Sequence, residues 1–350
     1  MMQGMPALVV VAPDGFKLTA SASAITAAVA EALAGRLAVV CDQCPMSDGG
    51  EGFVDVLETL GGTVRTTSVT GPLGAPVDAR WRLAGGSAVV EAAAACGLHL
   101  TGGPAGNDPE AAGTWGVGEL MVHAFRAGAR RVLVGVGGTA TTDGGKGALG
   151  ALEDAGYLEH VADPAITVEV ACDVATAFLD AACVFAPQKG ADGDQVARLT
   201  KRLAARAVEL EQRFGVDVTA LAGAGAGGGL AGALAAAGAQ LRSGAAMVAD
   251  AVCLDRRLAG ATVVVTGEGR FDATTTAGKV VDEVLRRAKA AGVPAIVVAG
   301  SVAPDAPSLP AVQVVDLSAR FGSRRAWDEP AACAAEAASD LLAERLDGER

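Results

Sequence analysis

The stretch ALVVVAPDGFK, residues 7–17, joins a short apolar run to a Pro-Asp-Gly turn, and it indicates the fold class. An apolar run this short suits a buried strand rather than a helix of ordinary length. Residues 19–34, which follow, are rich in alanine, open with hydroxyl residues and stop at Gly35, as helices do. A strand, a glycine turn and a helix in succession predict an α/β unit built on a parallel sheet.

The same alternation recurs along the chain. Apolar runs predict strands at 7–12, 38–42, 87–91, 131–136, 167–171, 182–186, 261–266, 294–299 and 312–317. Amphipathic or alanine-rich stretches predict helices at 19–34, 114–127, 192–214, 243–258, 277–291 and 329–346. Single cores stop growing at roughly 250–300 residues. For 350 residues we therefore expect two α/β domains with an active-site cleft between them.

Composition excludes several classes of function. The net charge of −12, without a run of Lys or Arg, argues against a nucleic-acid partner. The apolar runs are far shorter than the roughly 20 residues of a membrane helix, and the first residues do not read as a secretory signal. We expect a cytoplasmic enzyme. The seven scattered cysteines suit reduced thiols, and the lone CxxC at 41–44 is more readily a strand end than a zinc or redox site.

Glycine-rich loops follow several predicted strands, where bare backbone amides can bind phosphate. The first, PDGFK at 13–17, offers Asp14 and a cation, Lys17. The second, SDGGEG at 47–52, surrounds a glycine pair with acids. Its Asp48 could accept a hydroxyl proton or hold a metal, and alternatively it could cap a helix at 52–60.

The third loop, GGTATTDGG at 137–145, is the richest local signal because it joins hydroxyls, glycines and Asp143. The fourth, TGEGRFD at 266–272, precedes TTTAGK at 274–279. There Arg270 and Lys279 could clamp an anion while Glu268 or Asp272 holds Mg²⁺. A Walker A loop is rejected, because valine follows the lysine where a hydroxyl residue is needed.

Three further segments carry weaker signals. CDV at 172–174 and PQKG at 187–190 each follow a predicted strand, and the second offers a cation, Lys189. AGAGAGGGLAG at 222–232 is either a flexible linker or the glycine-rich start of a helix, and the leucines that follow favour the helix. The three histidines have no partner at catalytic or metal-binding spacing.

Taken in order along the chain, the four loops together with CDV and PQKG resemble the signature of type I glycerate kinases (glycerate 2-kinase), from about Val9 to Gly300. The resemblance implies ATP-dependent phosphorylation of D-glycerate to 2-phosphoglycerate, with ATP and Mg²⁺ as cofactors. It implies a discontinuous Rossmann-like domain with a parallel sheet, residues 1–70 plus 262–350, and an inserted α/β domain, 71–261. We place the joins near Thr70 and Ala261.

The motifs give a set of candidate site residues. We expect catalytic roles for Asp48, Asp143 and Lys17, with either acid as the proton acceptor, and metal binding by Glu268 and Asp272. The residues expected to bind substrate or phosphate are Asp14, Gly49, Gly50, Glu51, Gly138, Thr139, Thr141, Lys189, Arg270 and Lys279.

Departures from the family pattern leave the substrate open. Gly15 and Thr142 stand where the family usually has Ser and Asn, and the loop after Asp173 is shortened. A 3-phosphoglycerate product, a related hydroxyacid and a non-catalytic anion-binding relative remain alternatives. An NAD-dependent oxidoreductase is disfavoured, because no GxGxxG follows the first strand. Glycerate and a nucleotide are the expected partners, without nucleic acid or membrane.

Overall fold

The computed structural model describes residues 6–16, 19–276 and 278–348 as an α/β protein with two sheets. Its contacts separate two compact units. Unit 1 contains the described parts of Met1–Asp48 and Ala245–Arg350, and unit 2 is Gly49–Gly244. Unit 2 is thus inserted into unit 1. Both joins fall earlier in the chain than the predicted Thr70 and Ala261.

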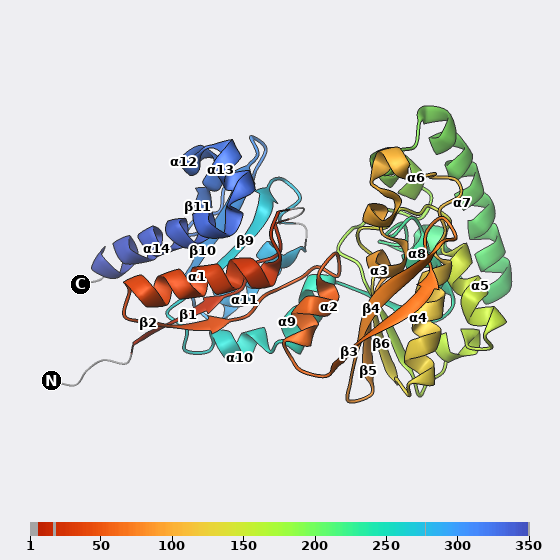
Figure 1. The fold of residues 1–350 in the computed structure, drawn as a ribbon, viewed down its shortest axis with the longest axis horizontal. Helices are drawn as coiled ribbons and strands as arrows, with labels where there is room; N and C mark the ends of the chain where they lie inside the picture. Colours follow the sequence, from red (N-terminus) through yellow and green to blue (C-terminus); the bar gives the residue numbers. More distant parts are fainter. Residues whose placement is uncertain (1–5, 17–18, 277, 349–350) are drawn as a thin grey trace. The chain divides into compact units, whose positions relative to one another are not determined.

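Unit 1 holds a five-stranded sheet, parallel throughout, in the order β11-β10-β9-β1-β2 (Figure 1). The middle strands are valine-rich because both faces of a parallel sheet are buried, where β-branched side chains pack well. The strands are β1 (Ala7–Val11), β2 (Val39–Gln43), β9 (Val263–Phe271), β10 (Ala295–Val302) and β11 (Gln313–Asp316).

Helices cover both faces of this sheet. On β10, Ile296 and Val298 belong to the core that includes α1 and α14, whereas Val297 and Ala299 pack in a second cluster with Val281 of α11. Figure 1 shows α1 and α14 side by side on one face. The helices are α1 (Ala22–Arg36), α9 (Gly244–Ala251), α10 (Leu254–Leu258), α11 (Val280–Ala290), α12 (Leu317–Phe321), α13 (Ser323–Asp328) and α14 (Pro330–Gly348).

Unit 2 holds a six-stranded mixed sheet in the order β3-β4-β5-β6-β7-β8. The first two pairings are antiparallel, and those from β5 to β8 are parallel. The carboxyl ends of β3, β5, β6, β7 and β8 therefore share one edge, the edge where open α/β sheets bind ligands. The strands are β3 (Thr63–Thr70), β4 (Pro76–Ala84), β5 (Ser87–Glu91), β6 (Arg131–Gly135), β7 (Thr167–Ala171) and β8 (Gln240–Arg242).

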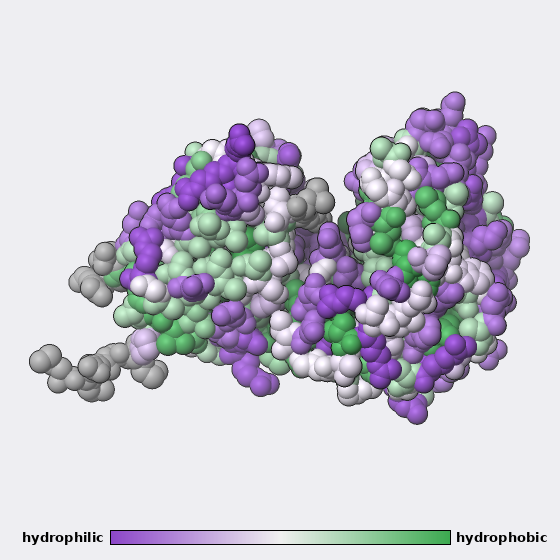
Figure 2. Space-filling view, in the orientation of Figure 1, coloured by the Kyte–Doolittle hydropathy of each residue, from purple (hydrophilic) through white to green (hydrophobic). Residues whose placement is uncertain are grey.

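The helices of unit 2 pack their apolar residues into one core with the sheet. The longest, α7, begins with a capping box between Asp192 and Gln195, and its polar face forms hydrophilic surface in Figure 2. The helices are α2 (Phe53–Glu58), α3 (Ala92–Cys96), α4 (Trp115–Arg126), α5 (Lys146–Asp154), α6 (Ala181–Phe185), α7 (Gly193–Phe214) and α8 (Leu230–Ala236).

The α/β prediction is confirmed, and three local expectations are corrected. Residues 182–186 form α6 instead of a strand, because a short alanine-rich run has good helix propensity and no decisive period. The helix expected at 243–258 is divided into α9 and α10 around Cys253, whose φ is 55°. The strands β3, β4 and β8 were not predicted. None of the described helices is long and apolar enough to cross a membrane.

Candidate active site

The loop that follows β6 folds around the side chain of Asp143. Its Oδ2 accepts hydrogen bonds from the Thr114 amide (3.0 Å), the Thr114 hydroxyl (2.8 Å) and the Gly147 amide (3.0 Å), and its Oδ1 accepts one from the Gly145 amide (2.9 Å). The Thr114 hydroxyl in turn accepts from the Ala148 amide at 2.9 Å. A carboxylate has about four acceptor positions. Asp143 therefore joins the start of α5 to the start of α4.

Lys189 lies inside the same loop with only 4% of its surface exposed. Its Nζ donates to the Thr141 carbonyl at 2.6 Å and to the Thr139 hydroxyl at 3.3 Å. The Asn107 amide group bridges the carbonyls of Ala140 (3.1 Å) and Lys189 (2.8 Å). Lys189 thus holds the backbone of the loop, and its ammonium is directed into the protein.

Burial also changes the ionisation of this lysine. It lowers the pKa of Lys189 to about 8, although electrostatic interactions with Cys96 and Asp143 act in the opposite direction. The nearby Cys96 thiol is fully buried, and burial raises its pKa to about 12. This thiol is therefore protonated near neutral pH, and it supplies no nucleophile.

The glycine-rich segment 222–232 packs behind this loop and leads into α8, so it is no flexible linker. Gly228 has φ +69°, and a Cβ there would lie 2.1 Å from the Thr141 carbonyl oxygen. Its own carbonyl accepts a hydrogen bond from the Gly144 amide at 3.0 Å. Glycine is needed because the two backbones approach too closely for any side chain.

The loop at 49–52 lies against the carboxyl ends of β6 and β7. Gly49 has φ +85°, and a Cβ there would lie 2.4 Å from Cβ of Ala171. A Cβ on Gly137 would meet the Cα of Gly50 at 2.7 Å. The second and third predicted motifs therefore meet within unit 2, with Gly49 buried, Gly50 half-buried and Glu51 exposed.

The helix after this loop, α2, is not capped by Asp48. Its N-cap residue is Gly52, which makes no side-chain capping bond. A carboxylate from β5 serves instead, since Glu91 accepts hydrogen bonds from the amides of Gly52 (3.3 Å) and Val54 (3.4 Å). The alternative in which Asp48 caps this helix is therefore wrong.

Unit 1 brings its own predicted loops together at the carboxyl edge of its sheet. The Asp14 amide donates to the carbonyl of Gly267 at 2.9 Å, which joins the loop after β1 to β9. The Met46 amide donates to the carbonyl of Pro13 at 3.0 Å, which adds the loop after β2. Asp48 is the last residue of the first segment of this unit and is half-buried. Lys17, which belongs to the first loop, lies outside the described residues.

The predicted loop at 266–272 is mostly strand, because β9 continues to Phe271 and pairs with β10. Glu268 in the later part of β9 and Asp272 just after it take part in a compact hydrogen-bonded turn. The buried Thr275 hydroxyl donates to Glu268 Oε1 at 2.6 Å and accepts from the Asp272 amide at 3.0 Å. Asp272 Oδ1 accepts from the hydroxyl (2.7 Å) and the amide (2.8 Å) of Thr274, and these bonds lower the pKa of Asp272. Arg270 approaches Asp272 Oδ2 at 3.4 Å. The turn thus holds two acids in fixed positions.

Lys279 extends this turn, since its Nζ donates to the Thr274 hydroxyl at 2.8 Å. Mg²⁺ commonly takes one or two protein carboxylates and completes its shell with water and phosphate oxygens. Glu268 and Asp272 fit that modest requirement. Among the described residues, no group of three or more His, Cys, Asp or Glu side chains could hold a metal ion by itself.

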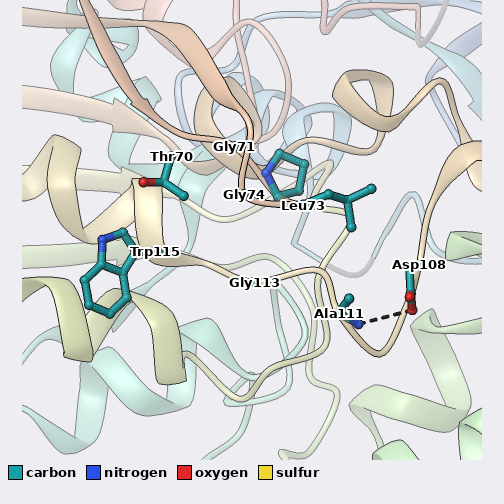
Figure 3. Close-up of a pocket in the computed structure, with 9 residues that line it drawn as sticks. Thr70, Gly71, Leu73, Gly74, Asp108, Ala111, Gly113 and Trp115 are labelled. Atoms are coloured by element: carbon teal, nitrogen blue, oxygen red, sulfur yellow. Dashed lines mark hydrogen bonds between the residues drawn. The ribbon is translucent and has the colours of Figure 1, made fainter.

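A pocket of about 550 Å³ lies beside the turn between β3 and β4 (Figure 3). Asp108, in its wall, already accepts hydrogen bonds from the amides of Glu110 (3.0 Å) and Ala111 (3.2 Å). The described residues that line it include no lysine, no arginine and no predicted site residue: Thr70, Gly71, Pro72, Leu73, Gly74, Asp108, Ala111, Gly113 and Trp115. The pocket offers no side-chain cation to a phosphate.

Three residues that organise these loops were missing from the sequence prediction. Thr114 was noted only as the start of a helix, and Asn107 and Glu91 were not considered as site residues. Glu91 carried a usable signal, because it is an acid at the carboxyl end of a predicted strand. Asn107 lies in a loop and carried no such signal.

The pKa of Lys189 leads to a prediction about stability. Between about pH 8 and its ordinary pKa of 10.5, the unfolded chain binds more protons at this residue than the folded chain. We therefore expect the wild type to gain stability relative to Lys189→Met as the pH rises through this window. Urea unfolding across the window measures this difference. Lys201→Met, at an exposed position on α7, is the control. If the stability difference between the wild type and Lys189→Met does not depend on pH, the pKa of Lys189 is not lowered in the folded protein.

Comparisons with known proteins agree with this arrangement. The glycerate kinase family matches residues 9–157 and 154–344. Glycerate 2-kinase of Escherichia coli K12 is 37% identical over 332 residues, which is 85% of this chain and 86% of the relative. An uncharacterized protein of Mycobacterium bovis is 44% identical over 320 residues, covering 87% and 82% of the two chains.

A solved structure extends the likeness to the fold. It is a crystal structure, provisionally assigned as glycerate kinase 2, from Salmonella typhimurium LT2. It has a TM-score of 0.76 and 35% identity, and the match covers 97% of this chain and 99% of that one. The resemblance seen in the six sequence motifs is thereby confirmed, and the chain belongs to the glycerate kinase family.

Proposed function

We propose that this kinase transfers the γ-phosphoryl group of ATP to the 2-hydroxyl of D-glycerate and releases ADP and 2-phosphoglycerate. Membership of a kinase family implies ATP as the donor. The observation that carries the choice of product is the 37% identity to a relative named glycerate 2-kinase, over 85% of this chain. Glycine-rich loops follow β1, β2 and β6, the kind of position at which backbone amides bind phosphate in other α/β proteins, and this supports the proposal.

The reaction asks the protein to align donor and acceptor and to neutralise charge. A bond forms between the glycerate oxygen and the γ-phosphorus, the bond to the bridging oxygen of ADP breaks, and the hydroxyl proton is released. We propose that Asp48 accepts this proton. Asp143 is less suited because four donors already occupy its carboxylate, and we propose that it positions the loop instead.

The remaining predicted residues divide between the two units. In unit 2, Thr139, Thr141 and Lys189 form the frame of a loop whose exposed Gly138 would contact substrate. In unit 1, Arg270 and Lys279 would meet phosphate oxygens beside Glu268 and Asp272, which would hold Mg²⁺. Bound there, Mg²⁺ would neutralise charge on the phosphates. Asp14 and Lys17 would complete the anion site of the first loop.

A second candidate is a kinase of a related small hydroxyacid. The loop after β7 departs from the family pattern, and Asp173 in it accepts a hydrogen bond from the Gly244 amide at 2.9 Å. Because this loop is shortened and tied down, it could shape a different acceptor site. L-glycerate and tartronate are the acceptors that distinguish this candidate from the first.

Phosphorus NMR of the product tests the proposal directly. The purified full chain, incubated with ATP, Mg²⁺ and D-glycerate, is expected to yield 2-phosphoglycerate as the dominant new phosphomonoester. Comparison with authentic 2- and 3-phosphoglycerate identifies it. A resonance of 3-phosphoglycerate would overturn the proposed position of transfer, and turnover with tartronate or L-glycerate but not D-glycerate would favour the second candidate.

A further inference from the structure

Glu91 is a buried acid that the proposed reaction has not used. It ends β5 at the carboxyl edge of the unit 2 sheet, and 9% of its surface is exposed. Its two carboxylate oxygens accept from different amides, Oε1 from Gly52 at 3.3 Å and Oε2 from Val54 at 3.4 Å. The side chain therefore ties a rigid strand to the segment that carries the second motif.

That segment has little other freedom. Gly49 lies too close to Ala171 for a side chain of its own, a Cβ on Gly137 would meet Gly50, and Gly52 is held by Glu91. Asp48 directly precedes this anchored segment in the chain. A shift of residues 49–52 would therefore displace the carboxylate of Asp48, and misplacement of a reacting group by about 1 Å can reduce the rate by about 10²-fold.

We propose that Glu91 is a positioning residue for phosphoryl transfer, whose ionised carboxylate anchors residues 49–52 through the amides of Gly52 and Val54 and so fixes Asp48. This inference rests on the role proposed above for Asp48. Ionised carboxylates accept amide hydrogen bonds more strongly than neutral ones. A protonated Glu91 would keep one good acceptor and direct a hydroxyl toward a second donor.

The surroundings of Glu91 bring its ionisation into the physiological range. Burial, with smaller contributions from the negative charges of Asp55 and Glu51, raises the pKa of Glu91 to about 7 despite the two amide hydrogen bonds. Glu91 is therefore partly protonated just below neutral pH. The anchor should weaken as the pH falls through about 7.

Charged groups on the other neighbouring elements are engaged elsewhere. On β4, Arg80 pairs with Asp55 at 2.7 Å and Glu58 at 3.2 Å, and Arg82 donates to the carbonyl of residue 61. The residue opposite Glu91 on β6 is a glycine, and α3 contributes only a thiol. On α4, the glutamate at 119 accepts from a β3 amide. Protonation of Glu91 itself is therefore the event expected near pH 7.

The test compares Glu91→Gln with Glu119→Gln. Glu119 is a matched control in the same unit, because its Oε2 accepts from the Thr70 amide at 2.6 Å. For Glu91→Gln we expect kcat for glycerate phosphorylation at about pH 8 to fall by about 10-fold or more, with KM values changed much less. The wild-type kcat should decline below about pH 7, and the variant should lack that decline.

Amide hydrogen exchange gives a readout that needs no substrate. Exchange at Gly52 and Val54 should be faster in Glu91→Gln than in the wild type and unchanged in Glu119→Gln. Two results would overturn the positioning role. One is unchanged exchange at both amides, and the other is a kcat of Glu91→Gln within about twofold of the wild type with the same pH profile. Wild-type protein without turnover would refute the proposed function, and exchange would then decide alone whether Glu91 anchors the loop.

Discussion

Replacement of Asp48 by asparagine is expected to lower kcat for glycerate phosphorylation by about 10²–10⁴-fold, the range that loss of a general base costs. KM values should change much less, because the lost interaction belongs to the transition state. The free energy of unfolding should change much less than kcat, because asparagine keeps the size of the half-buried Asp48 side chain and one of its acceptor oxygens. Steady-state kinetics and urea unfolding measure the two effects.

The position of Asp48 in the chain gives the physical reason for this expectation. Before it, the Cys44 amide bonds to the carbonyl of Val11 at 2.9 Å and the Met46 amide to that of Pro13 at 3.0 Å. After it, Gly49 is packed against Ala171. The backbone just before Asp48 is therefore held within unit 1, and a carboxylate that is already positioned loses little entropy when it meets a hydroxyl. Asp78→Asn, at an exposed position on β4, serves as the control. If Asp48→Asn keeps more than about a tenth of the wild-type kcat, Asp48 is not the general base.

Replacement of Asp143 by alanine is expected to lower the free energy of unfolding by about 3–5 kcal/mol. Hydrogen bonds to a charged group contribute about 1.5–3 kcal/mol each, and bonds within one network are not additive. The substitution would leave the amides of Thr114, Gly145 and Gly147 without their partner. Turnover should fall as well, because the loop that includes Thr139 and Thr141 would lose its anchor.

Asp163→Ala is the matched control for this stability effect. Asp163 also accepts a hydrogen bond from a backbone amide, that of Ala165 at 2.8 Å, but in an exposed turn. Its removal should cost about 1 kcal/mol or less. Equal losses for the two variants in urea unfolding would show that the Asp143 network contributes little. Asp143→Asn, which retains one acceptor oxygen, should fall between Asp143→Ala and the wild type.

The parallel strands could be predicted from sequence because they are buried on both faces. β1, β5 and β7 appear as short continuous apolar runs, and they were found to within a residue. β3 and β4 were missed because they are antiparallel strands without a continuous apolar run, and TVRTTSVT contains only two apolar residues. For β3, enrichment in the β-branched residues Thr and Val was the signal that could have found it.

The site could be predicted only in part. Loop glycines and acids are local signals, so three glycine-rich loops could be located before the fold was known, whereas the fourth, at 266–272, belongs mostly to β9. Their partners are not local: Thr114 precedes Asp143 by 29 residues, and Asn107 reaches Lys189 across 82. Lys189 was expected to bind phosphate, but only its buried hydrogen bonds suggest a positioning role. Such roles depend on tertiary contacts, which one sequence does not encode in any short pattern.

A coupled ADP-release assay on the purified full chain tests the central claim most directly. With ATP, Mg²⁺ and D-glycerate, we predict ADP release that depends on glycerate and is largely lost in Asp48→Asn. If none of D-glycerate, L-glycerate and tartronate stimulates ADP release, the proposal that this protein phosphorylates a small hydroxyacid is contradicted.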